Sequence, residues 1–441
     1  MTQGRRGRGG LAVRVSQTLA FRVAGLVFSL VASIVTARLL GPALRGELVV
    51  MLTIPALLAA VSLMGADNAN LYFSGRSELG HPRVVRYSLI HAFVGGTVVV
   101  VAGLIIATFV PGIRLGLSEP MFAVALAMTP VALLISLLGT AEAGRGRAPS
   151  VAALTAAGLG VWALIAAAVG ALGNPSPLLL FAAFCVAQLA VGIALLIRSG
   201  RPGLAGAFGW PQYASYALRT NLPALAMLLL LRVDIPAIQL LAGPREVGLY
   251  SIVLPMAESL MLISTAVNVV VLPGVANGSI DVHRALRVTH VAVAASALAA
   301  LALAATAPFL VPGLFGAPFA DAVPLLWVLL PGIVVFTAGR SLQIYLLGSG
   351  NIRASAIAAI AALAVCIVGD LVLVPGLGAM GAAAATTAAY VVFATIETWA
   401  VVRGTGVGWR AVLVPGPAFT SSVVALVRRA RLPSDGGDSW L

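Results

Sequence analysis

The chain has no lysine and very little charge of either sign. Only 9% of its 441 residues are charged, whereas 60% are hydrophobic and the mean hydropathy is +1.06. Soluble domains carry about 25% charged residues, which cover the surface that faces water. A chain with so few charges cannot build such a surface, so we predict that most of its exterior contacts lipid.

Groups that carry chemistry are also scarce. The two cysteines, Cys185 and Cys366, lie inside apolar runs and are typical of small buried hydrophobic residues. The four histidines lack the spacing of metal ligands, no Walker loop occurs, and no loop is long enough to form a catalytic domain. We therefore expect no metal, no cofactor and no enzymatic activity.

The apolar runs have the length of membrane-spanning helices. Runs such as 94–110 and 291–311 are continuous over about twenty residues, whereas barrel strands alternate apolar and polar residues over about ten. We predict an all-α polytopic membrane protein with about twelve transmembrane helices. Their expected ranges are 15–38, 47–73, 86–110, 120–140, 149–172, 177–198, 215–242, 246–275, 287–311, 322–347, 353–374 and 379–403.

The arginines predict the orientation of these helices. All 27 basic residues are arginine, and most fall in alternate loops, as the positive-inside rule requires if both termini are cytoplasmic. The inner group is Arg5, Arg6, Arg8, Arg14, Arg76, Arg83, Arg86, Arg145, Arg147, Arg198, Arg201, Arg284, Arg287, Arg353, Arg403, Arg410, Arg428, Arg429 and Arg431. The expected outer loops hold Arg38, Arg45, Arg114 and Arg245. Because the net charge of +13 is spread over many loops, we expect no nucleic-acid partner.

An internal repeat divides the chain into two halves. Gly41-Pro42 and Gly46 recur as Gly243-Pro244 and Gly248, and a weaker echo links 138–148 with 347–354. The first apolar run also resembles a cleavable signal peptide, but its place in this repeat favours a retained helix. We predict two six-helix lobes in parallel orientation with a substrate path between them. The expected divisions are a basic N-tail at 1–14, an N-lobe at 15–198, a linker at 199–214, a C-lobe at 215–403 and a basic C-terminal tail at 404–441.

Four arginines remain at membrane depth after the loops are assigned. They are Arg22, Arg219, Arg232 and Arg340. Arg22, Ser29, Ser33 and Thr36 fall on one helical face, which favours the wall of a wet cavity. The alternative is that the small residues ease helix packing while Arg22 reaches the inner interface.

Buried acids are the candidates for ion binding. Asp234 is the strongest, because it lies deep in the seventh predicted helix and points away from Arg232. Its alternative role is to neutralise an arginine on another helix. Glu258 lies on a polar stripe of the eighth helix, Gln343 forms a polar patch with Arg340, and Asp370 and Glu397 are weaker candidates.

Several motifs together resemble the polysaccharide-transport (O-antigen flippase-like) family of the MOP superfamily, which also contains MATE drug exporters and lipid II flippases. They occur in the family's order over about residues 15–403. The motifs are TARLLGP at 36–42 with GEL at 46–48, RVDI at 232–235 with GPREVGLYS at 243–251, LFGAPF at 314–319, LPG at 330–332, and VPGLGAMGAA at 374–383.

The resemblance implies a V-shaped pair of six-helix lobes that works by alternating access. It implies a flippase in the cytoplasmic membrane that moves polyprenyl-diphosphate-linked oligosaccharide, driven by a proton or sodium gradient, alongside membrane lipids and glycan polymerases or glycosyltransferases. Arg22, Arg232 and Arg340 would then hold the diphosphate. Asp370 stands where the family often has a neutral amide, so its part in ion coupling stays open.

Four alternatives remain. A MATE-type drug or cation antiporter would favour acidic over basic cavity groups, which the four arginines at membrane depth oppose. A lipid II flippase would fit the same fold but often has two further helices. A membrane glycan polymerase or ligase would need a large external loop, and an assembly partner would not need charges at the midplane.

Overall fold

The computed structural model describes residues 3–75, 81–173, 175–203, 210–276, 278 and 280–414, and within them every regular element is a helix. The first half contains α1 (Gln3–Leu63), α2 (Ala66–Gly75), α3 (His81–Ile90), η1 (His91–Gly95), α4 (Gly96–Phe109), η2 (Pro111–Arg114), α5 (Glu119–Ala127), α6 (Thr129–Glu142), η3 (Ala143–Arg147), α7 (Ala148–Ala171) and α8 (Pro177–Ser199). The second half contains α9 (Trp210–Leu230), α10 (Asp234–Leu241), α11 (Pro244–Ser259), α12 (Met261–Ala276), α13 (Val282–Phe315), η4 (Ala317–Ala322), α14 (Val323–Gly348), α15 (Ile352–Leu377), α16 (Ala379–Thr405) and α17 (Trp409–Leu413).

The chain is a multi-pass membrane protein. In the described part, nine helical segments are long and apolar enough to cross a membrane, or ten if the bent pair Ala224–Leu230 and Asp234–Leu241 counts as one span. Large apolar side chains on these segments face outward, among them Phe109 and Phe309, each at least 80% exposed. Such side chains are stable on the exterior only in lipid.

Two of the nine segments are too long for one crossing. Ser16–Leu63 has 48 residues and Glu119–Ala171 has 53, which at about 1.5 Å per residue is more than twice the roughly 30 Å hydrocarbon core. Each contains a glycine with positive φ, Gly41 at 67° and Gly146 at 76°, where the helix breaks. Both breaks fall between two predicted spans; the total of twelve and the cytoplasmic termini stay predictions.

One predicted span is broken in its middle. The sequence predicts a single helix over 215–242, whereas α9 ends at Leu230 and α10 begins at Asp234, with the two axes bent by 41°. Pro236 has no N–H to bond the carbonyl of Arg232, so an uninterrupted helix is disfavoured here. The break places Asp234 at the first turn of α10, inside the protein.

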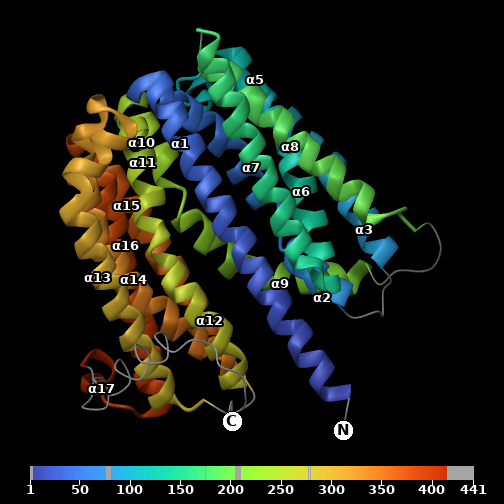
Figure 1. Ribbon diagram of the computed structural model, residues 1–441, viewed down its shortest axis with the longest axis vertical. Helices are drawn as coiled ribbons and strands as arrows, with labels where there is room; N and C mark the ends of the chain where they lie inside the picture. The colour runs from blue at the N-terminus through green and yellow to red at the C-terminus, as the bar shows by residue number, and fades with distance from the viewer. Residues whose placement is uncertain are drawn as a thin grey trace.

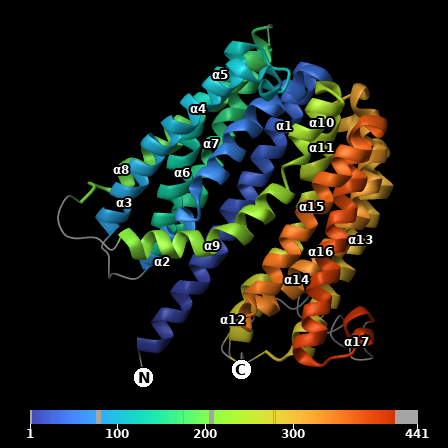
Figure 2. The ribbon, with the colours of Figure 1, turned by 180° about the vertical axis from the view of Figure 1, so that it is seen from behind.

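The helices form two groups that meet at one end and spread at the other, as a V (Figures 1 and 2). The first group, the N-lobe, comprises α1 to α8, and the second, the C-lobe, comprises α10 to α16. We call the end at which α1, α10 and α11 meet the converged end. The helix between the groups, α9, crosses obliquely and contacts α2 in one lobe and α15 in the other (Figure 2).

Candidate functional site

The two copies of the repeat pack against each other at the converged end. A Cβ on Gly46 would lie 1.8 Å from the carbonyl oxygen of Pro244, and one on Gly248 would lie 1.8 Å from that of Pro42. The contact is therefore reciprocal, with the glycine of each lobe lying on the proline of the other. Only glycine permits this approach, because real Cβ contacts are never so short. We call this contact the seam.

Further hydrogen bonds join the lobes at the same end. The Arg38 guanidinium donates to the carbonyls of Gly313 (2.5 Å) and Leu314 (2.7 Å), which are exposed carbonyls at the end of α13. The side-chain amide of Gln239 in α10 donates to the carbonyl of Leu115 beside η2, at 2.8 Å. The converged end is thus closed by backbone packing and by polar contacts between the lobes.

A cavity of about 520 Å³ lies between the lobes on the open side of the seam. Its walls come from α1 and α7 of the N-lobe and from α11, α12 and α13 of the C-lobe. Ser29, Ser33 and Thr36, three of the four residues of the stripe described on α1, line it. Arg22 is exposed on α1 and is not among the lining residues. The other walls are apolar apart from Ser259 and Arg45.

Arg45 is the lining residue that the sequence did not single out. Counting arginines by loop predicts an outer, solvated position, whereas the side chain is 5% exposed. It donates from Nε to Ser251 Oγ (3.0 Å), from Nη1 to the Ser33 carbonyl (3.0 Å) and Thr36 Oγ1 (2.5 Å), and from Nη2 to Ser33 Oγ (2.8 Å). The break at Gly41 turns this part of α1 inward. A loop count cannot detect this fold-back.

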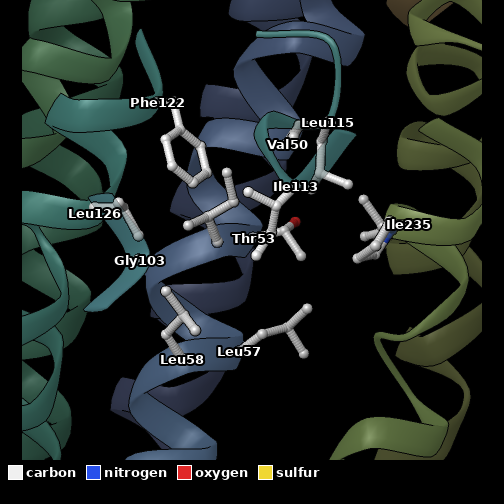
Figure 3. Close-up of a pocket in the computed structure, with 12 residues that line it drawn as sticks. Val50, Thr53, Leu57, Leu58, Gly103, Ile113, Leu115, Phe122, Leu126 and Ile235 are labelled. Atoms are coloured by element: carbon white, nitrogen blue, oxygen red, sulfur yellow. The ribbon is translucent and has the colours of Figure 1, made fainter. Parts of the chain in front are cut away.

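A smaller, apolar cavity of about 190 Å³ lies beside the seam (Figure 3). Val50, Leu57 and Leu58 of α1 face Phe122 and Leu126 across it. Ile235 and Pro236 of α10 close it from the C-lobe side. Apolar side chains of both lobes therefore face each other across this cavity, next to the seam.

Two predicted site residues form an ion pair in the C-lobe. The Arg232 guanidinium contacts both carboxylate oxygens of Glu258, at 3.0 and 3.2 Å. Arg232 lies in the turn between α9 and α10, and Glu258 lies near the end of α11. Such a bidentate pair holds both side chains in place and neutralises them.

Asp234, two residues after Arg232, lies in a fully buried cluster. Its carboxylate accepts hydrogen bonds from the Tyr250 hydroxyl and from the backbone N–H of Ile235, at 3.0 Å for the latter. The same Tyr250 hydroxyl lies 3.4 Å from Thr386 Oγ1 of α16. These contacts come from three helices, and two of the residues, Asp234 and Tyr250, belong to the RVDI and GPREVGLYS motifs.

Asp370 belongs to the same region of the C-lobe. It is 1% exposed, Cys366 Sγ lies 3.8 Å from one carboxylate oxygen, and the other oxygen has no hydrogen-bond partner in the described residues. The nearby Tyr390 hydroxyl also has none there. The region therefore contains two buried carboxylates, and one oxygen of Asp370 forms no hydrogen bond within the described residues. Within the described residues, no three His, Cys, Asp or Glu side chains lie together so as to hold a metal ion.

The last predicted polar groups lie farther along α14 and α16. Arg340 donates to Gln343 at 2.5 Å, one turn away. Glu397 is completely buried and accepts one hydrogen bond, from Ser355 at 3.3 Å. Arg219 lies in α9, and its side chain is outside the described residues.

The structure also shows an N-lobe network that the sequence did not predict. The buried Glu142 accepts from Arg145 (3.3 Å) and Arg147 (3.1 Å) and lies 3.1 Å from His81 Nε2. His81 also contacts the carbonyl of Ser199. The network ties the ends of α3, α6 and α8 together. The sequence signal for these ion pairs was the short spacing between Glu142 and the arginines on either side of Gly146.

Comparison with known proteins identifies the fold. No family model matches the sequence, and no curated protein sequence matches it. Among solved structures, the lipid II flippase MurJ in an inward closed conformation superposes with a TM-score of 0.73 at 14% identity, over 97% of this chain and 94% of that one. A multidrug resistance MATE family transporter of the MOP superfamily superposes with a TM-score of 0.67 in its inward-facing conformation and 0.62 in its outward-facing one. Both matches have 16% identity and cover 90% of this chain, with 98% and 96% of the other chain respectively. The chain therefore shares the fold of these solved structures.

Proposed function

We propose that the protein is a flippase of the cytoplasmic membrane that moves polyprenyl-diphosphate-linked oligosaccharide by alternating access. The observation that carries this proposal is the inter-lobe cavity, in which the polar stripe on α1 faces mainly apolar C-lobe side chains, among them Leu303 and Leu310 of α13. Such a cavity suits a ligand with a polar head and a hydrocarbon chain. A soluble metabolite would not need these apolar walls.

The fold supports the same class of substrate. One structural neighbour is named a flippase of lipid II, which is an amphiphile. The sequence motifs resemble polysaccharide transporters, and the predicted partners are enzymes that assemble or polymerise glycans. In this proposal the lobes are closed toward the outside and receive the lipid from the inner leaflet.

The C-lobe supplies the proposed ion-coupling site. Asp234 and Asp370 are buried carboxylates in one lobe, and Tyr250 links Asp234 to Thr386. Charged groups at membrane depth mark ion pathways because their burial is costly. Binding of a proton or sodium ion there would reduce that cost and shift the balance between the two conformations. The Arg232–Glu258 pair would stabilise the bend between α9 and α10.

A MATE-type antiporter is the second candidate, because MATE structures share this fold. A cationic drug would need acidic groups facing the cavity. The residues that line the cavity include Arg45 and no acid. The cavity therefore favours an anionic amphiphile, and a lipid II flippase remains the nearest alternative substrate assignment.

Proteoliposomes test the proposal directly. Purified protein would be reconstituted with fluorescent polyprenyl-diphosphate oligosaccharide, and its exposure on each leaflet would be followed by quenching. We expect movement that accelerates under an imposed proton or sodium gradient, and Asp234→Asn should remove that acceleration. Export of an organic cation, with no lipid movement, would replace the flippase by the antiporter.

A further inference from the structure

The environment of Arg45 suggests a role beyond packing. Its four hydrogen bonds all go to neutral oxygens, namely the hydroxyls of Ser33, Thr36 and Ser251 and one carbonyl. Among the described residues no acidic side chain forms an ion pair with it. A buried charge without a counter-ion is unfavourable, so this guanidinium has a strong tendency to bind an anion.

The hydroxyl groups around Arg45 are oriented to accept. Ser251 Oγ donates its own hydrogen to the Gly248 carbonyl at 2.8 Å, and Thr36 Oγ1 donates to the Ala32 carbonyl at 2.7 Å. Their lone pairs therefore face the guanidinium. These hydroxyls hold Arg45 in position without neutralising it.

One of these hydrogen bonds crosses between the lobes. Arg45 belongs to α1, whereas Ser251 lies on α11, one turn after the seam glycine Gly248. Arg45 thus contacts the seam on one side and the cavity on the other. An anion that enters the cavity and an oxygen of the opposite lobe compete for the same guanidinium.

We propose that Arg45 is the anion-binding residue of the inter-lobe cavity, and that a phosphate or diphosphate group bound there draws Arg45 away from Ser251 and so loosens the seam. This inference deepens the proposed function by naming the residue that recognises the head group. Two phosphate oxygens match the planar fork of a guanidinium better than two separate hydroxyls do. The loss of an inter-lobe bond then links ligand binding to opening of the converged end.

Binding measurements on the purified full-length protein test this inference. The probe is geranylgeranyl diphosphate, compared with inorganic pyrophosphate and with geranylgeraniol. For Arg45→Gln we expect at least about a tenfold loss of diphosphate affinity, and for Arg45→Lys a smaller loss. Geranylgeraniol binding should not respond to either substitution.

Ser251→Ala separates the proposed role from a structural one. It removes the competing oxygen, so geranylgeranyl diphosphate should bind about threefold to tenfold more tightly. Ser349→Ala is the matched control, because Ser349 at the end of α14 does not line the cavity and its hydroxyl donates to the Leu346 carbonyl at 2.9 Å. This control should leave the affinity unchanged.

The outcomes are decisive in both directions. Wild-type affinity in a folded Arg45→Gln or Arg45→Lys protein, or no tightening in Ser251→Ala, would overturn the inference. Equal affinity for inorganic pyrophosphate and geranylgeranyl diphosphate would keep Arg45 as the anion site but assign it to the free anion. If the protein moves lipid but Arg45→Gln does not change diphosphate binding, the role of Arg45 is rejected and the flippase proposal stands. Arg45-dependent binding without any lipid movement would reject the flippase instead.

Discussion

The two Gly-Pro segments of the repeat share a backbone and differ in chemistry. Gly41 has φ 67° and ψ 177°, and Gly243 has φ 92° and ψ 177°, so the two segments turn in the same way into the following proline. The N-lobe segment then places Arg45 beside the cavity, whereas the corresponding C-lobe residue is Val247, which is fully buried. The repeat therefore conserves the closure of the seam but supplies the cation from one lobe only.

The distribution of buried charge shows the same asymmetry. In the C-lobe, Asp234, Asp370 and Glu397 are each at most 1% exposed. In the described part of the N-lobe, the acid that is buried to the same extent is Glu142, at the end of α6, and it pairs with Arg145 and Arg147. We infer a division of labour in which the C-lobe binds the driving ion and the N-lobe contributes Arg45 to substrate recognition.

The largest expected effect comes from disrupting the close packing of the two glycines at the seam. Gly46→Ala or Gly248→Ala would place a methyl group against a backbone carbonyl that cannot move independently. We expect each to lower the stability of the closed form by about 3 kcal/mol, measured by unfolding in mixed micelles. Gly404→Ala is the control, because a Cβ there meets nothing within 4 Å. Stabilities equal to that of the control would show that the seam is not close-packed.

Breaking the C-lobe ion pair should have the next largest effect. Arg232→Ala leaves Glu258 partly buried without its partner, which we expect to cost about 2 kcal/mol of stability. The double variant with Glu258→Gln should recover about half of that loss, since it removes the unpaired charge. The same unfolding measurement applies. Additive losses in the double variant would contradict the pairing seen between α9–α10 and α11.

Neutralising the buried cluster should affect coupling more than folding. Asp234→Asn keeps a hydrogen-bonding side chain beside Tyr250 but removes the charge. We expect gradient-driven lipid movement to fall about tenfold, equivalent to about 1.4 kcal/mol in the barrier, while movement without a gradient persists. Glu142→Gln in the N-lobe is the comparison and should retain its response to the gradient. If both variants lose it, the assignment of ion binding to the C-lobe is wrong.

The smallest effect is expected at the outer surface of the C-lobe. Arg245 contacts Asp321 at 2.7 Å, but the two side chains are 57% and 66% exposed. Arg245→Gln should change the stability by less than about 1 kcal/mol. A larger loss would show that this exposed pair belongs to the seam rather than to the surface.

The sequence predicted the membrane class and the equivalence of the two Gly-Pro segments, whereas the predicted linker at 199–214 falls partly outside the described residues. It also placed Ser29 and Ser33 on a cavity wall, because spacing along one helix is a local property. It missed the burial of Arg45, which depends on the turn at Gly41 and on a partner 206 residues away. It assigned Arg232 to substrate and Glu258 to ion coupling, whereas the structure pairs them, because contacts between helices leave no spacing in the sequence.

In the proposed mechanism, the lobes separate at the seam during transport. Spin labels at Val110→Cys and Leu377→Cys, both exposed near the converged end, would report this in a background with Cys185 and Cys366 replaced by alanine. The distance between the two spin labels, measured by double electron–electron resonance, should lengthen when lipid diphosphate and an ion gradient are present together. An unchanged distance, in protein shown to move the lipid, would contradict alternating access through the seam.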